Sequence, residues 1–78
     1  MNARIEVTDT FAGEANYSWV RRAEIDVVPG QSDLSVVRQL KKLVELNGVR
    51  CVLGYDCGTE RRYNVVGACI CFFITWED

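Results

Sequence analysis

Hydrophobic and polar residues alternate along the first third of the chain, which is the pattern of half-buried β-strands. One strand is predicted over residues 4–8 and a second over residues 17–28, with residues 10–16 as the loop between them. In the second strand the inward-facing residues are Ala23, Ile25 and Val27. The same phase carried backwards places Arg21, Trp19 and Tyr17 on that face, which requires Arg21 to reach the rim of the sheet or a β-bulge to shift the register.

The period of the apolar residues then changes from two to that of an α-helix. Pro29-Gly30 ends the second strand, and Ser32 or Asp33 supplies an N-cap. A helix is predicted over residues 34–46, with Asn47-Gly48 as its C-cap. Its apolar stripe is formed by Leu34, Val37, Leu40, Leu43 and Val44.

Strand patterns return after the helix. A third strand is predicted over residues 49–53, a turn-rich connection over residues 54–60, and then either one long strand over residues 61–76 or a pair of strands broken near Gly67. The chain is therefore expected to form one α+β domain over residues 1–78. Its single amphipathic helix would pack on a four- to five-stranded antiparallel sheet, in the order β-β-α-β-β.

The segment Ala68–Trp76 differs from the other strands because both of its faces are apolar. Its odd positions are Cys69, Cys71 and Phe73, and its even positions are aliphatic or aromatic. One helix covers only one face of a sheet. The face with Cys69, Cys71 and Phe73 is therefore either a surface for self-association or is covered by residues 10–16 and 54–60.

The composition points away from catalysis. The chain has no histidine, which removes the commonest general base and the commonest zinc ligand, and it has no glycine-rich phosphate loop. Its four cysteines lack the C-x2-C spacing of zinc sites, so they are expected to be free thiols that pack in the protein. No enzyme activity, cofactor or metal is predicted.

Charge and hydropathy restrict the partners. The net charge of −2 is not the basic footprint of a nucleic-acid-binding domain, so direct binding of nucleic acid is not expected. Residues 1–10 contain no apolar run of the length of a signal peptide, and the longest apolar run is too short to span a bilayer. A cytoplasmic protein with reduced cysteines and no membrane partner is predicted.

Two arginine pairs stand beside aromatic residues. Arg21-Arg22 follows Tyr17 and Trp19, and Arg61-Arg62 precedes Tyr63. Adjacent strand residues point to opposite faces, so each pair is expected to place one guanidinium on each face. Arginine with aromatic residues is typical of binding hot spots. The predicted partner-binding residues are Glu14, Tyr17, Trp19, Arg21, Arg22, Asp56, Arg61 and Arg62.

The segment DTFAGEANYSWVRR, residues 9–22, resembles a segment of short uncharacterised proteins of phages, plasmids and other mobile elements. Small size and acidity are also similar to those of anti-CRISPR proteins, by analogy rather than by a motif. The resemblance implies an accessory protein that binds a host protein or nucleoprotein complex stoichiometrically and inhibits host defence. The alternatives are a homodimeric interaction domain, paired through the Cys69–Phe73 face, and a module for single-stranded nucleic acid.

Overall fold

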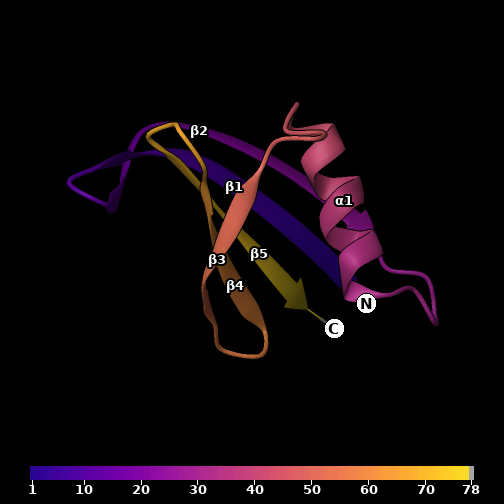
Figure 1. Ribbon diagram of the computed structural model, residues 1–78. Coiled ribbons are helices and arrows are strands. Elements are labelled where there is room, and N and C mark those ends of the chain that lie inside the picture. Colours follow the sequence, from indigo (N-terminus) through magenta and orange to yellow (C-terminus); the bar gives the residue numbers. More distant parts are fainter. Residues whose placement is uncertain (78) are drawn as a thin grey trace.

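Residues 1–77, which the computed structural model describes, form one antiparallel sheet of five strands with one helix on one of its faces (Figure 1). The predicted α+β class is confirmed, and residues 61–76 form a pair of strands broken near Gly67 rather than one strand. The elements are β1 (Asn2–Phe11), β2 (Glu14–Asp26), α1 (Asp33–Leu43), β3 (Cys51–Asp56), β4 (Glu60–Val65) and β5 (Ile70–Glu77).

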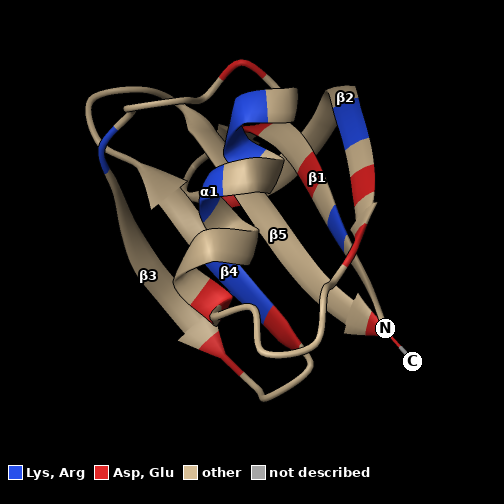
Figure 2. Cartoon of the chain, turned by 90° about the vertical axis from the view of Figure 1, so that its right-hand side faces the viewer, with Lys and Arg blue, Asp and Glu red and all other residues tan. Residues whose placement is uncertain are grey.

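The strands lie in the order β2-β1-β5-β4-β3, and every neighbouring pair is antiparallel. The central strand β5 therefore joins the N-terminal hairpin to the C-terminal strands, although β1 and β5 are far apart in sequence. The edge strands β2 and β3 each have one unpaired side. Figure 2 shows α1 in front of the sheet between these two edges. Within residues 1–77 no helix is long and apolar enough to cross a bilayer.

The helix begins one residue before the predicted range and ends earlier than predicted. The Ser32 hydroxyl accepts a hydrogen bond from the backbone N–H of Ser35, so Ser32 is the N-cap. The predicted Asn47-Gly48 C-cap is wrong, because the helix ends at Leu43 and Glu45 adopts the left-handed conformation with φ of 64°. This turn lets Leu46 N–H reach the Lys41 carbonyl at 2.8 Å and returns the Leu46 side chain to the core.

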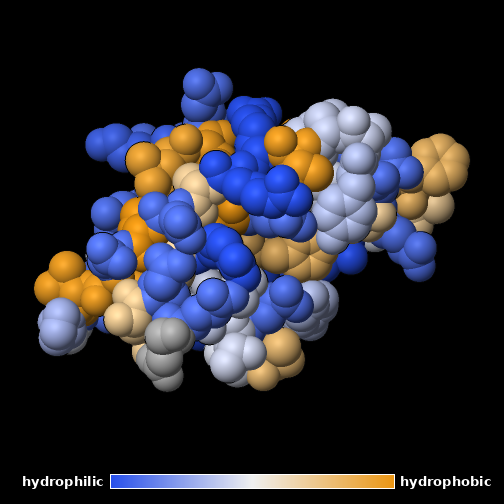
Figure 3. Space-filling model, turned by 180° about the vertical axis from the view of Figure 1, so that it is seen from behind, coloured by the Kyte–Doolittle hydropathy of each residue, from blue (hydrophilic) through white to orange (hydrophobic). Residues whose placement is uncertain are grey.

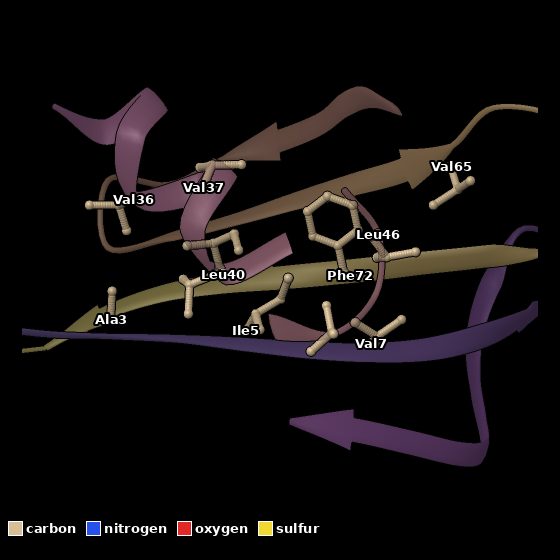
Figure 4. Packing of buried hydrophobic residues seen from close by; sticks show 11 residues of the cluster. Ala3, Ile5, Val7, Val36, Val37, Leu40, Leu46, Val65 and Phe72 are labelled. Atoms are coloured by element: carbon tan, nitrogen blue, oxygen red, sulfur yellow. The ribbon is translucent and has the colours of Figure 1, made fainter. Parts of the chain in front are cut away.

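The core lies between the helix and one face of the sheet (Figure 4). Val36 and Leu40 of α1 are fully buried with Ile5 of β1 and Phe72 of β5. Two members of the predicted helical stripe are placed differently. They are Leu34, 60% exposed, and Leu43, 55% exposed. The buried side of α1 is instead formed by Val36, Val37 and Leu40, because only one side of the helix faces the sheet.

Three predicted boundaries are wrong for local reasons. Residues 10–16 are mostly strand, because a tight turn at Ala12 and Gly13, both with positive φ, lets β1 and β2 pair almost to their ends. Strand β3 continues to Asp56 through a bulge at Gly54. Strand β5 begins at Ile70, so residues 66–69 form the turn before it.

Candidate functional site on the outer face of the sheet

The sheet face opposite the helix, called here the outer face, is hollowed at its centre. The hollow encloses about 410 Å³ between the two hairpins of the sheet. We call this site the outer hollow and define it by its lining side chains, which are those of Arg4, Glu6, Tyr17, Arg22, Tyr55, Glu60, Phe73 and Thr75. These residues come from β1, β2, β3, β4 and β5, so the site exists only when the whole sheet has formed.

Tyr17 reaches the outer face because β2 is bulged. The register between β1 and β2 shifts between Thr8 and Thr10, and Tyr17 has φ of 56°. Simple alternation would put Tyr17 on the helix side with Trp19, and that prediction is wrong for Tyr17. The shift of register, which the sequence allowed as an alternative, reverses the direction of this side chain.

The carboxylate of Asp9 holds this bulge in place. Its oxygens accept hydrogen bonds from the backbone N–H of Ser18 at 3.0 Å, from the Ser18 hydroxyl at 2.7 Å and from the side-chain amide of Asn16 at 2.9 Å. The buried Thr8 hydroxyl accepts the Tyr17 N–H at 2.9 Å. The Ser18 hydroxyl, followed by the Asn16 amide, lowers the pKa of Asp9 to about 2. These bonds offset the cost of a left-handed tyrosine, roughly 1–2 kcal/mol.

A second bulge brings Tyr55 to the same hollow. The register of β3 against β4 shifts between Leu53 and Tyr55, at Gly54. Tyr55 then lies opposite Arg62 on the outer face, and its hydroxyl donates to Glu60 Oε2 at 2.7 Å. This bond stabilises the protonated phenol and raises the pKa of Tyr55 to about 12.

Phe73 of the central strand forms the floor of the hollow. Its ring lies 6.5 Å from that of Tyr55, and the Arg62 guanidinium lies 5.9 Å from its centroid. Arg62 Nη2 also donates to the Gly13 carbonyl at 2.8 Å, which ties the tip of the β1–β2 hairpin to β4. Part of the outer face is therefore covered by residues from the ranges 10–16 and 54–60. Such cover is the arrangement that was predicted from the sequence as the alternative to self-association.

The rim of the hollow carries charges of both signs. Arg22 Nε donates to Glu6 Oε2 at 2.9 Å, and the Arg22 side chain remains 64% exposed. Arg4 forms an ion pair with Glu77. Exposed pairs of this kind contribute little to stability, about 0–1 kcal/mol each. The arginines are therefore available to exchange these partners for those of another molecule.

Each arginine pair is divided between the two faces, as predicted. Arg21 points to the helix side, where its guanidinium lies 5.2 Å from the Trp19 ring and donates to the C-cap carbonyl of Val44 at 3.3 Å. This contact explains how Arg21 can face the helix side, because the carbonyl end of a helix attracts a cation. Arg22 points to the outer hollow. The predicted partner-binding residues therefore divide between the two faces of the sheet. The outer face holds Tyr17, Arg22 and the adjacent Arg62. The helix side holds Trp19 and Arg21.

Arg61 and Asp56 have a structural role that the sequence prediction did not include. Arg61 Nη2 donates to Asp33 Oδ2 of the helix N-terminus at 2.7 Å, and Arg61 Nε donates to Asp56 Oδ2 at 2.9 Å. Its guanidinium also lies 4.9 Å from the ring of Trp76. The Gly58 N–H, followed by the charge of Arg61, lowers the pKa of Asp56. Both side chains are thus engaged within the fold. Glu14 lies exposed at the start of β2.

The predicted self-association residues do not form one surface. Cys71 is fully buried on the outer side of β5, and this burial raises the pKa of its thiol. Cys69 is exposed in the turn before β5, so only Phe73 remains as part of the outer hollow. All four cysteines are free. Within residues 1–77 no group of three cysteine and carboxylate side chains is placed to hold a metal ion.

Phe73 was predicted for self-association only, and the lining residues that the prediction from sequence missed are Arg4, Glu6, Tyr55, Glu60 and Thr75. Gly54 inside a strand pattern is the available signal, because such a glycine often marks a bulge that reverses the following side chain. No family model, curated protein or solved structure matches this chain. The outer hollow is therefore interpreted from its own geometry.

Proposed function

We propose that this protein acts by stoichiometric binding, and that the outer hollow is the surface that its partner occupies. The observation that carries the proposal is that the half-buried Phe73 ring shares the hollow with two exposed tyrosines, with arginines at the rim. Rigid aromatic anchors with arginines are the composition of interface hot spots, because they supply large contact area and directed hydrogen bonds at low entropic cost.

The charges support a protein or nucleoprotein partner over bare nucleic acid. Arg4 and Arg22 are each balanced by a carboxylate at the rim, so the hollow presents both signs of charge. A nucleic-acid groove would present a run of unbalanced cations. A partner that projects an apolar or aromatic side chain onto Phe73 and polar groups onto the rim fits this arrangement.

The resemblance of residues 9–22 supports a particular class of partner. That segment contains Asp9, its hydrogen-bond donors, Tyr17 and Arg22, which together build one wall of the hollow. We propose that the partner is a host protein or nucleoprotein complex in the cytoplasm. The result of binding would be inhibition of a host defence complex by a mobile-element accessory protein, in the manner of anti-CRISPR proteins.

Two matched pairs of variants test the surface. Tyr17→Ala and Arg22→Ala alter the outer hollow, whereas Trp19→Ala and Arg21→Ala alter neighbouring residues on the helix side. Each tagged protein is used to capture partners from host lysate, with quantitative mass spectrometry. A partner retained by the wild type and by the helix-side variants, but lost by at least tenfold from the outer-hollow variants, supports the proposal. A partner lost equally from both pairs, or retained by all variants, contradicts it.

A further inference from the structure

The two edges of the sheet differ in charge. Strand β2 carries Arg22, Glu24 and Asp26 along its length. Figure 3, which views the molecule from behind, shows hydrophobic and hydrophilic side chains side by side on that face. Strand β3 carries no charge before Asp56 (Figure 2). Charges on an edge strand protect it from pairing with another chain. Strand β2 is protected in this way, and β3 is not.

The β3 edge also exposes apolar side chains. Val52 is 56% exposed, Leu53 is 54% exposed and Tyr55 is 41% exposed. With Leu53 on the helix side and Val52 and Tyr55 on the outer side, both surfaces next to the edge are apolar. A strand added at this edge would cover part of the exposed surface of Val52 and Leu53.

The hydrogen bonds to β4 show which backbone groups of β3 point outward. Val66 N–H donates to the Arg50 carbonyl at 3.0 Å, so residues 50 and 66 form a hydrogen-bonded pair. Hydrogen-bonded and non-hydrogen-bonded pairs alternate in an antiparallel ladder. Cys51 and Leu53, which lie opposite Val65 and Tyr63, therefore direct their N–H and C=O groups away from β4. The bulge at Gly54 ends this alternation.

We propose that the β3 edge pairs with the β3 edge of a second copy of this chain, in an antiparallel register centred on Val52. In this register Cys51 of each copy lies opposite Leu53 of the other, so every outward-directed group of these two residues gains a partner. Centring on Leu53 would set Cys51 opposite Tyr55, whose backbone faces β4 because of the bulge. Centring on Cys51 would set Leu53 opposite Val49, whose N–H already bonds the Leu46 carbonyl at 3.1 Å.

The charges agree with self-pairing in this register. Arg50 lies opposite Gly54 of the other copy, so no like charges are opposed. The two Val52 residues meet on the two-fold axis as a non-hydrogen-bonded pair, with Cα atoms about 4.5 Å apart. Such a contact is closed, because both copies use the same edge, that of β3. The contact uses the backbone edge of β3, whereas the proposed function uses the outer face of the sheet, so the inference goes beyond the proposed function.

Sedimentation velocity of the whole chain at rising concentration tests the proposal. The wild type is expected to form dimers in the micromolar range, and Val52→Lys to weaken dimerisation at least tenfold, because two ammonium groups then meet at the axis. Val28→Lys is the control, since Val28 is 64% exposed on the connection between β2 and α1. Circular dichroism confirms that each variant is folded. A wild type that stays monomeric at several hundred micromolar, or a dimer that survives Val52→Lys, overturns the proposal.

Cross-linking tests the register independently. In a background with the three non-buried cysteines replaced by serine, Val52→Cys is expected to form a disulfide-linked dimer under mild oxidation. The expected Cα separation falls within the range that a disulfide spans, about 4.4–6.8 Å. Val28→Cys in the same background is expected to cross-link at least tenfold more slowly. Equal rates for the two variants would show random collision and refute the register.

Discussion

Leu40 and Leu43 lie almost one turn apart on α1, and their substitution by alanine measures which side of the helix faces the sheet. Leu40 is fully buried against the sheet, whereas Leu43 is 55% exposed. Both residues belong to the apolar stripe that periodicity predicts, so sequence alone treats them as equivalent. The structure predicts that they contribute very differently to the free energy of unfolding.

The expected losses follow from burial. Leu40→Ala removes three buried carbon groups, or roughly 2.4 kcal/mol of transfer free energy at about 0.8 kcal/mol each. The cavity that remains adds a further cost of about 1 kcal/mol, which gives a total of about 3–4 kcal/mol. Leu43→Ala removes less buried surface and leaves a site open to water, so its cost is expected to be below about 1 kcal/mol. A small domain has a total stability on the order of 0.05–0.15 kcal/mol per residue, so only the first loss is severe.

Urea unfolding followed by tryptophan fluorescence and far-ultraviolet circular dichroism measures both losses, with a constant m value as evidence of unchanged compactness. The melting temperature of Leu40→Ala should fall by at least about 12 °C, and that of Leu43→Ala by less than about 8 °C. If Leu40→Ala does not fold, Leu40→Val gives the same comparison with a smaller deletion. Equal losses at the two positions, or a larger loss at Leu43, would refute the packing of α1 described above.

Three further predictions concern the bulge, the hollow and the helix cap. Because folding lowers the pKa of Asp9 from 3.8 to about 2, its contribution to stability is complete above about pH 4 and is lost as the pH falls through about 2. Asp9→Asn should therefore be less stable than the wild type at neutral pH. Its stability should also fall less than that of the wild type between about pH 4 and pH 2 in pH-dependent unfolding, and an unchanged acid transition would contradict this. Absorbance titration should show Tyr55 ionising near pH 12, and Glu60→Gln should return its pKa toward 10, whereas an unchanged value would exclude the hydrogen bond as the cause. Glu45→Gly should stabilise the protein by about 1 kcal/mol in thermal unfolding, because the left-handed conformation costs glycine no steric strain; a loss of stability would show that the cap does not form as described.

The sequence predicts the elements well where one period persists over many residues. The alternation in β1 and in the second half of β2 correctly places Ile5, Val7, Ala23 and Ile25 toward the core, because a regular pleat sends every second side chain to one face. The N-cap was narrowed to Ser32 or Asp33 for a similarly local reason, since the observed cap at Ser32 depends on a hydroxyl and an N–H three residues apart.

The candidate site was predicted less well because it depends on interruptions of those periods. Tyr17 and Tyr55 both reach the outer hollow through bulges, and each bulge is stabilised by groups outside its own strand. The Asp9 carboxylate of β1 supports the bulge of β2, and the pairing of β3 with β4 sets the bulge at Gly54. A pattern along one strand does not contain these contacts.

The sequence by itself therefore determined the class of fold, the number of helices and the division of each arginine pair between two faces. These properties follow from local periodicity and from the obligation to bury apolar side chains. Only the tertiary structure decided that β5 lies between β1 and β4, that Tyr17 and Tyr55 line one hollow with Phe73, and that β3 is left as an edge with no charge before Asp56. These properties depend on which strands become neighbours and in what register, and that choice is made by contacts between residues far apart in the chain.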